Sequence, residues 1–128
     1  MGQDNSRPQP GDLIMIYRAL YQHWALYVGD GYVIHVTGKA CATWQGNSSS
    51  ISATRAKVKK ELLTKVAGNH KWRVNNKYDR SRTPLPVKEI IRRAEQWIDR
   101  EVEYDVLDSN CEHFVTELRY GEAASDQV

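Results

Sequence analysis

This 128-residue chain has few cysteines and no long apolar run. No stretch approaches the roughly 18 consecutive apolar residues that a membrane-spanning helix needs. The polar start, residues 1–6, also lacks the apolar segment of a secretory signal. Only Cys41 and Cys111 are present. We therefore expect two free thiols in a reducing, cytoplasmic setting, in a protein that is soluble or peripheral to membranes.

The net charge is also small, at +2, but the charged residues are unevenly distributed. Residues 55–93 contain thirteen lysines and arginines against three acidic residues, whereas residues 94–128 contain two against ten. The basic segment is typical either of an ordinary solvated face or of attraction to an anionic membrane surface. Nucleic acid is not expected as a partner, because the segment lacks interleaved aromatic residues and any nucleic-acid-binding signature.

A chain of this length can bury one hydrophobic core, so we expect a single domain over residues 1–128. Within it, we expect a flexible N-terminus at 1–9, a flexible polar loop at about 37–55 and a tail stub at 122–128. The apolar run at 13–17 predicts a buried strand. The remaining patterns predict short strands within 56–74, a helix opened by residues 83–86 with a buried stripe from Val87 to Ile98, a strand at 102–106, and a last helix from about Asn110 to Leu118, closed near Gly121.

A β-hairpin is the strongest local prediction, with strands at 23–28 and 32–36 around Gly29-Asp30-Gly31. The loop length decides where two histidines point. A two-residue turn would put His23 and His35 on opposite faces of the sheet. A three-residue loop, with Gly31 in the left-handed bulge position, would put them on one face as diagonal neighbours. We predict the three-residue loop.

Cys111 is the candidate nucleophile. In the predicted capping box, Ser109 is the N-cap and Glu112 is at N3, which leaves Cys111 in the first helical turn. Unpaired amides and the helix dipole at that position favour the thiolate. A histidine on a neighbouring strand could then take its proton.

Other interpretations of these residues stay open. Cysteine is commonly buried as a small hydrophobe, and His23, His35, Cys111 and His113 could instead bind zinc, although their spacing matches no compact ligand motif. We expect His113 to support packing, His70 to be an exposed turn residue and Cys41 to be a bystander.

The stretch HWALYVGDGYVIH at residues 23–35 and the stretch NCEHFV at 110–115 resemble the H-box and NC motifs of the phospholipase A and acyltransferase family, the HRAS-like suppressor proteins, within the lecithin retinol acyltransferase superfamily. Further matching stretches lie at 10–14, 58–63, 73–77, 84–86 and 118–121. The similarity spans roughly residues 8 to 128.

This resemblance implies a fold and an activity. The fold is an α+β, circularly permuted papain-like (NlpC-type) domain, in which an antiparallel sheet carries the histidines and a helix carries the nucleophile at its N-terminus. The activity is that of a calcium-independent cysteine phospholipase A1/A2 and acyltransferase without cofactor or metal. Its acyl acceptors are water, the amine of phosphatidylethanolamine or a lysophospholipid. The implied partners are phospholipid substrate and the surface of intracellular membranes, met by a monomer.

The resemblance also implies roles for individual residues. Cys111 is the nucleophile, His23 the general base and acid, and His35 the third polar group, which leaves the imidazole pair neutral. A thioester then carries the acyl chain. The backbone amide of Cys111 is a candidate oxyanion donor. Weaker support candidates are Tyr21, Arg18 and Asn110.

The sequence departs from the family in two places. Relatives usually continue into a hydrophobic membrane anchor, whereas this chain stops at Val128, so either an anchor has been trimmed from it or this member lacks one. In both cases we expect thiol chemistry to survive, whereas membrane residence and turnover at the lipid surface would be affected. Residues 37–55 replace a more apolar stretch, with Trp44 and the basic segment as candidates for headgroup contact.

Two alternative functions remain at this point. The site could serve a thiol peptidase or isopeptidase, or it could be vestigial in a protein-interaction module. Separately, Met1-Gly2 with Ser6 matches a short N-myristoylation pattern.

Overall fold

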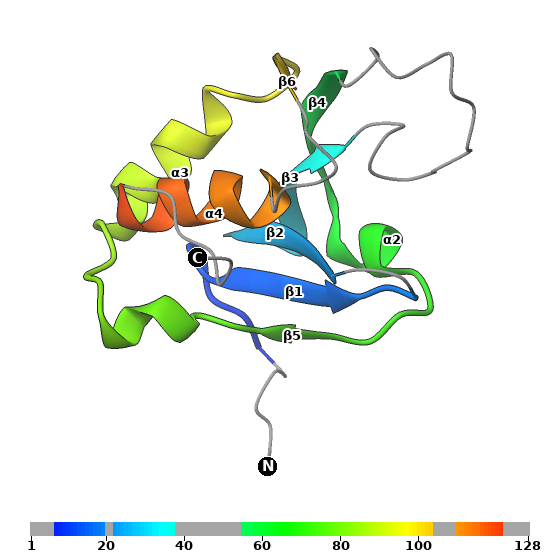
Figure 1. Cartoon of the computed structure of the whole chain (residues 1–128), viewed down its shortest axis with the longest axis horizontal. Coiled ribbons are helices and arrows are strands. Elements are labelled where there is room, and N and C mark those ends of the chain that lie inside the picture. The colour runs from blue at the N-terminus through cyan, green and yellow to red at the C-terminus, as the bar shows by residue number, and fades with distance from the viewer. Residues whose placement is uncertain (1–6, 20–21, 38–54, 104–109, 122–128) are drawn as a thin grey trace.

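The computed structural model describes residues 7–19, 22–37, 55–103 and 110–121, and its centre is a six-stranded antiparallel sheet (Figure 1). The strands are β1 (Leu13–Tyr17), β2 (Gln22–Gly29), β3 (Tyr32–Thr37), β4 (Arg55–Leu62), β5 (Trp72–Val74) and β6 (Glu101–Glu103). Their order in the sheet is β5-β1-β2-β3-β4-β6. Neighbouring strands along the chain are thus mostly neighbours in space, as in a meander.

Helices complete an α+β fold. They are α2 (Leu63–Ala67), the 3-10 helix η2 (Lys77–Arg80), α3 (Val87–Glu95) and α4 (Asn110–Tyr120). In Figure 1, α3 and α4 lie together beside the sheet, while α2 lies at its other end. This arrangement leaves α4 in contact with the central strands β2 and β3.

Alternating side chains divide the strands between two apolar clusters. One cluster contains Leu13, Met15, Trp24 and Leu26 of the sheet with Ile90, Ala94, Val115 and Leu118 of α3 and α4. The other contains Ile14, Ile16, Ala25 and Val33 with Leu63, Val66 and Ala67 of α2. Because each fully buried large aliphatic side chain contributes about 1.5–3 kcal/mol, these two clusters hold the helices on the sheet.

The strand predicted at 13–17 is confirmed as β1, and strands in the segment 56–74 are confirmed as β4 and β5. A helix was not expected within that segment, yet Leu63 to Ala67 form α2. Its Leu63, Val66 and Ala67 are buried, and Gly68 ends it with a φ of 58°. Burial of this short apolar face therefore overrides the strand pattern.

The helix predicted after residues 83–86 is real but shorter than expected. It begins at Val87, which is 49% exposed rather than part of the buried stripe, and it ends at Glu95. Trp97 and Ile98 follow in a turn and still pack against the core. The helix ends early because the backbone turns away to pair with β4: four residues after Glu95, Asp99 has a φ of 69° and its N donates to the Val58 carbonyl at 2.7 Å.

The last helix is confirmed, with α4 running from Asn110 to Tyr120 and Gly121 following at a φ of 87°. The predicted strand at 102–106 is seen only as β6, because residues 104–106 lie outside the described part of the chain. The predicted loop at about 37–55, apart from its ends, also lies outside it, as do the two termini and Ser109.

The hairpin between β2 and β3 has the predicted register but a different turn. Leu26 pairs with Ile34 and Tyr27 with Val33, as the three-residue loop required. Gly29 then pairs with Tyr32, so the loop is the two-residue Asp30-Gly31 turn, and a bulge between Tyr27 and Gly29 restores the register. Both turn residues have positive φ, 55° and 87°, as a type I′ turn requires.

A partly buried ion-pair network fixes the C-terminal end of α4. Arg119 donates to both carboxylate oxygens of Asp79 in η2, from Nε at 3.2 Å and from Nη2 at 2.8 Å, and from Nη1 to the Gly11 carbonyl at 2.7 Å. Tyr120 Oη donates to Asp79 Oδ1 at 2.6 Å. Two segments far apart in sequence are thereby tied to the helix that carries Cys111.

Two groups in this network have shifted pKa values. Burial works to raise the pKa of Asp79, but hydrogen bonds from Arg119 and Tyr120 outweigh it, so the pKa lies below its ordinary value of 3.8. Burial, reinforced by donation to Asp79, raises the pKa of Tyr120 to about 12. Ionised Asp79 therefore stabilises the folded state above its ordinary pKa, and that contribution is lost as the pH falls through the lower folded-state pKa.

Replacing Asp79 by Asn should lower the free energy of unfolding at pH 7 by about 1–2 kcal/mol, because charge-assisted bonds to the buried Arg119 are lost, although partial exposure of Asp79 weakens them. The deficit should shrink as the pH falls below about 4. Urea unfolding of both proteins at pH 7 and pH 3 measures this. Glu95→Gln, on the exposed side of α3, is the control. A deficit that does not change with pH would contradict the account.

Candidate active site

Cys111 is the second residue of α4. Its side chain is 6% exposed and belongs to the core cluster that α4 forms with the sheet. The first four amides of a helix have no partner within the helix, and they carry the positive end of its dipole. The fold thus places a thiol where developing negative charge on sulfur and on a neighbouring oxygen is favoured.

Two imidazoles follow the thiol in a series of contacts. Cys111 Sγ lies 3.6 Å from His23 Nδ1, and His23 Nε2 lies 2.9 Å from His35 Nδ1. The rings meet edge to face, with centroids 5.1 Å apart and planes at 81°. Both histidines are only 3% exposed. The predicted common-face placement of His23 and His35 is therefore confirmed.

The histidines lie where the two strands of the hairpin part. Within the described strands, the ladder between β2 and β3 runs from the turn to Leu26 and Ile34. Beyond that point β2 stays paired with β1 as far as Gln22, and β3 stays paired with β4 as far as Thr37. The two imidazoles bridge this diverging end of the hairpin, and the thiol of α4 meets them there.

A carboxylate continues this series of contacts, and the sequence analysis did not predict it. Glu61 Oε1 on β4 lies 3.1 Å from His35 Nε2. The expectation that His35, as the third polar group, leaves the imidazole pair neutral is thus incomplete, because it did not include this carboxylate. The pairing of β3 with β4 brings residues 26 positions apart together, and only a prediction of that strand pairing could have found the contact.

Glu112 holds the first turn of α4 from its other side. Its carboxylate is buried, accepts a hydrogen bond from Tyr78 Oη at 2.9 Å and lies 3.9 Å from Lys77 Nζ. The predicted capping box cannot be compared, because Ser109 lies outside the described residues. In the structure, Glu112, the residue next to Cys111, connects the first turn of α4 with η2.

Of the weaker support candidates, the structure describes the side chain of Arg18, which contacts groups away from the thiol. Arg18 donates from Nη2 to the Val66 carbonyl at 3.1 Å and contacts His70 Nδ1 at 3.2 Å, so it is directed toward α2. His70 is exposed, as predicted, and His113 is partly buried on α4. Tyr21, Cys41 and the side chain of Asn110 lie outside what the structure describes.

Metal and membrane features can be examined within residues 7–19, 22–37, 55–103 and 110–121. No group of three or more His, Cys, Asp or Glu side chains in those ranges is arranged to hold a metal ion. None of the helices there is long and apolar enough to cross a bilayer. The reactive groups that the structure brings together are a thiol, two imidazoles and a carboxylate, in series.

Such a series can perform nucleophilic catalysis. An imidazole in contact with a thiol can take its proton and later return it to a leaving group, and a second imidazole can hold the first in a fixed orientation. The start of a helix supplies amide donors for an oxyanion. The geometry is therefore suited to acyl transfer through a covalent sulfur intermediate.

Known proteins with similar sequences agree with this chemistry. The chain is 55% identical over 123 residues to phospholipase A and acyltransferase 3 of Mus musculus, covering 94% of this chain and 76% of the relative. It is 53% identical over 122 residues to phospholipase A and acyltransferase 1 of Rattus norvegicus, covering 94% and 73%. The family model for lecithin retinol acyltransferase matches residues 6–124. The chain therefore belongs to the lecithin retinol acyltransferase family, whose papain-like fold is consistent with this α+β architecture.

Proposed function

We propose that this protein is a cysteine phospholipase A and acyltransferase that works through a thioester on Cys111. The observation that carries the proposal is the series of contacts from Cys111 Sγ to His23 Nδ1 at 3.6 Å and from His23 Nε2 to His35 Nδ1 at 2.9 Å. The names of the relatives support a phospholipid substrate over a peptide. The thiol peptidase remains an outcome that the experiments below can reveal.

The first half of the reaction forms the acyl-enzyme. His23 Nδ1 takes the proton of the Cys111 thiol, and the thiolate attacks the ester carbonyl carbon of a glycerophospholipid at sn-1 or sn-2. A C–S bond forms and the carbonyl oxygen becomes an oxyanion. The ester C–O bond then breaks, and His23 gives the proton to the departing lysophospholipid oxygen. A thioester remains on Cys111.

The second half releases the acyl chain. An acceptor attacks the thioester carbonyl while His23 Nδ1 takes the acceptor's proton. The C–S bond breaks, and the thiolate recovers the proton from His23. Water as acceptor gives a fatty acid, the phosphatidylethanolamine amine gives an N-acyl product, and a lysophospholipid hydroxyl gives a diacyl lipid. Hydrolysis and transfer thus differ only in the acceptor.

Two further parts of the site support these steps. His35 contacts the second nitrogen of His23, so it holds that ring in place and shares the positive charge that forms on it. The backbone amide of Cys111 lies in the first turn of α4, at the positive end of the helix dipole, which suits it as an oxyanion donor. Asn110 and Tyr21 are further proposed donors from their positions in the chain.

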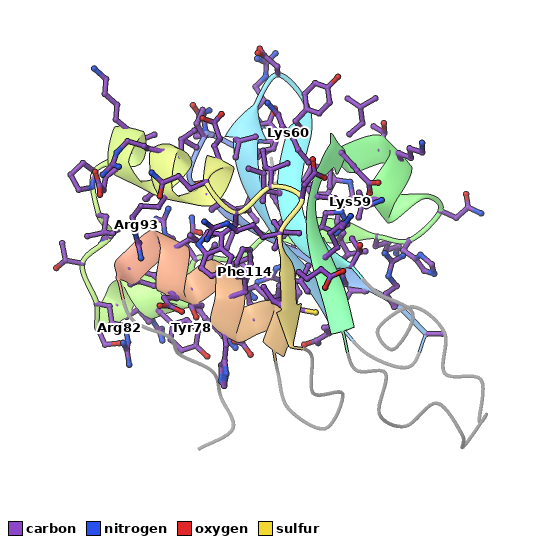
Figure 2. All side chains as sticks on the ribbon, turned by 90° about the horizontal axis from the view of Figure 1, so that it is seen from above. Lys59, Lys60, Tyr78, Arg82, Arg93 and Phe114 are labelled. Atoms are coloured by element: carbon purple, nitrogen blue, oxygen red, sulfur yellow. The ribbon has the colours of Figure 1, made fainter. Side chains whose placement is uncertain are left out.

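We propose that the protein acts as a monomer, because one chain supplies the nucleophile and both histidines, and that it acts without calcium. We also propose that it works at the surface of intracellular membranes. On β4, Lys59 is the cross-strand partner of His35, and Lys57 that of Thr37, and both lysines are exposed. In Figure 2, Lys59 and Lys60 lie over the sheet, away from Arg82 and Arg93 near the helices. These cations suit an approach to anionic lipid beside the site.

Thiol activation by His23 is tested by alkylation. In a Cys41→Ser background, iodoacetamide should modify Cys111 at pH 7 about tenfold more slowly once His23 is replaced by Gln, because an unassisted thiol is only a few per cent thiolate. Mass spectrometry over time gives the rates. His113→Gln is the matched control and should react like the parent. Equal rates in the His23 and His113 variants would refute activation by His23.

The acyl-enzyme is tested by intact mass. After the protein is mixed with phosphatidylcholine vesicles and quenched in acid, the mass should rise by one acyl group, located on Cys111 by peptide mapping. Cys111→Ala should lose the adduct, fatty acid release and N-acylphosphatidylethanolamine formation together. Cys111→Ser should lose nearly all activity. Full activity of the Ala variant, or cleavage of peptides in place of phospholipid, would overturn the proposal.

Membrane approach is tested by charge reversal in a Cys111→Ala background, where lipid is not consumed. The double variant Lys57→Glu and Lys59→Glu should bind phosphatidylcholine–phosphatidylserine vesicles about tenfold or more weakly in a sedimentation assay. Each lysine near such a surface contributes roughly 1 kcal/mol to the binding free energy. Arg80→Glu with Lys88→Glu changes the net charge equally on exposed residues of η2 and α3. Equal weakening by both pairs would argue against a surface centred on β4.

A further inference from the structure

We propose that Glu61 is a fourth member of the active site, a positioning residue that fixes the tautomers of His35 and His23 so that the nitrogen facing Cys111 is free to accept a proton. The inference rests on the proposed thiol mechanism and adds a residue to it. Glu61 does not touch the thiol, so its effect passes through the two imidazoles.

The placement of Glu61 follows from strand register. His35 on β3 pairs with Lys59 on β4, and Val33 pairs with Glu61. Glu61 is therefore the diagonal neighbour of His35 on the same face of the sheet, a relation that long side chains can bridge. The carboxylate does so, with Oε1 at 3.1 Å from His35 Nε2.

The carboxylate decides which nitrogen of His35 carries hydrogen. An ionised carboxylate only accepts hydrogen bonds, so at this contact His35 Nε2 must be the donor. In a neutral ring, His35 Nδ1 is then a bare acceptor. It faces His23 Nε2 at 2.9 Å, which must therefore carry its own hydrogen.

The same logic reaches the nucleophile. When His23 carries hydrogen on Nε2, its Nδ1 is the bare nitrogen, and this is the atom 3.6 Å from Cys111 Sγ. The thiol therefore meets a base rather than a second N–H group. Without the carboxylate, each imidazole could carry its hydrogen on Nδ1 in place of Nε2. His23 would then have an N–H group facing Cys111 and could not accept the thiol proton.

Glu61 also balances the charge that appears during catalysis. When His23 takes the thiol proton it becomes an imidazolium, and its Nε2 proton can shift to His35 Nδ1. The positive charge then lies on His35 beside the carboxylate of Glu61, while His23 keeps the proton on Nδ1. When His23 gives that proton to the leaving group, the proton on His35 Nδ1 returns to His23 Nε2, so both rings end neutral. No proton is gained or lost in this shift, and the side chain of Glu61, which is 34% exposed, stays in partial contact with water.

Other charged groups lie on β4 and on the elements next to it. On β4, Lys59 is the cross-strand partner of His35, and Lys57, two residues before Lys59, is the partner of Glu101 of β6. Lys65 is exposed on α2, which packs next to β4. The contact of Glu61 with His35 distinguishes it from these residues, because it joins the carboxylate to a nitrogen of the relay.

The test compares Glu61→Met with Glu117→Met. Methionine keeps the length of the side chain but cannot accept the hydrogen bond in the same way, and Glu117 is an exposed carboxylate on α4, the helix of Cys111. We expect Glu61→Met to lower kcat for phospholipid hydrolysis by about 10- to 100-fold, the effect of one charge-assisted hydrogen bond, with little change in KM. Glu117→Met should stay within about twofold of the parent.

A spectroscopic measurement separates positioning from a merely structural effect. In protein labelled with nitrogen-15 at histidine, long-range nitrogen–proton spectra at pH 7.5 should show the Nε2–H tautomer for both His23 and His35. Glu61→Met should shift both toward a mixture, while the spectrum of Glu117→Met matches the parent. Variants of His23 and His35 assign the signals.

Each outcome bears on one claim. If the parent forms no acyl adduct on Cys111, the proposed function fails, whatever Glu61 does. If the parent forms the adduct but Glu61→Met keeps full kcat, or loses activity with both tautomers unchanged, the positioning role is wrong. An Nδ1–H tautomer of His35 in the parent would overturn it as well.

Discussion

One bulge in a β-hairpin sets the geometry of the candidate active site, because side chains alternate between faces along a strand and a shift of one residue would separate the two histidines. The Asp30-Gly31 turn alone would produce that separation. The bulge between Tyr27 and Gly29 corrects the register, and His23 and His35 then approach to 2.9 Å. Three positive φ values in succession, at Gly29, Asp30 and Gly31, make this backbone path possible.

The site is a buried polar series inside an apolar setting, and its stability depends on its hydrogen bonds being matched. Two histidines at 3% exposure would each lose stabilising contacts with water if they had no partners. Here each ring contacts the other, and the ends of the series are a thiol and a partly exposed carboxylate. Such a series specifies one arrangement of protons, which is what an acyl-transfer site needs.

The helix that brings the thiol is held at both ends. Glu112 ties its first turn to η2 through Tyr78, and Arg119 and Tyr120 tie its last turn to Asp79 of the same short helix. Between these contacts, Val115 and Leu118 pack on the sheet. The position of Cys111 is therefore set by contacts along the whole of α4, most of them distant from the chemistry.

Much of this architecture could be predicted from local patterns. The apolar run of β1, the hairpin and the helix behind Cys111 all follow from residues close together in sequence, and the side shared by His23 and His35 follows from their register. The contact of Glu61 with His35 could not be predicted, because it depends on how β3 pairs with β4 across residues 38–54. The early end of α3 was missed for a similar reason, since pairing of Asp99 with Val58 is a tertiary contact.

The central claim is that one thioester on Cys111 supplies the acyl group to every acceptor. The most direct test is the ratio of fatty acid to transferred product at a fixed acceptor concentration, measured with phosphatidylcholine and then phosphatidylglycerol carrying the same acyl chains. A shared intermediate has lost its donor headgroup before the acceptor attacks, so the account predicts the same ratio from both donors. A ratio that changes with the headgroup would contradict it.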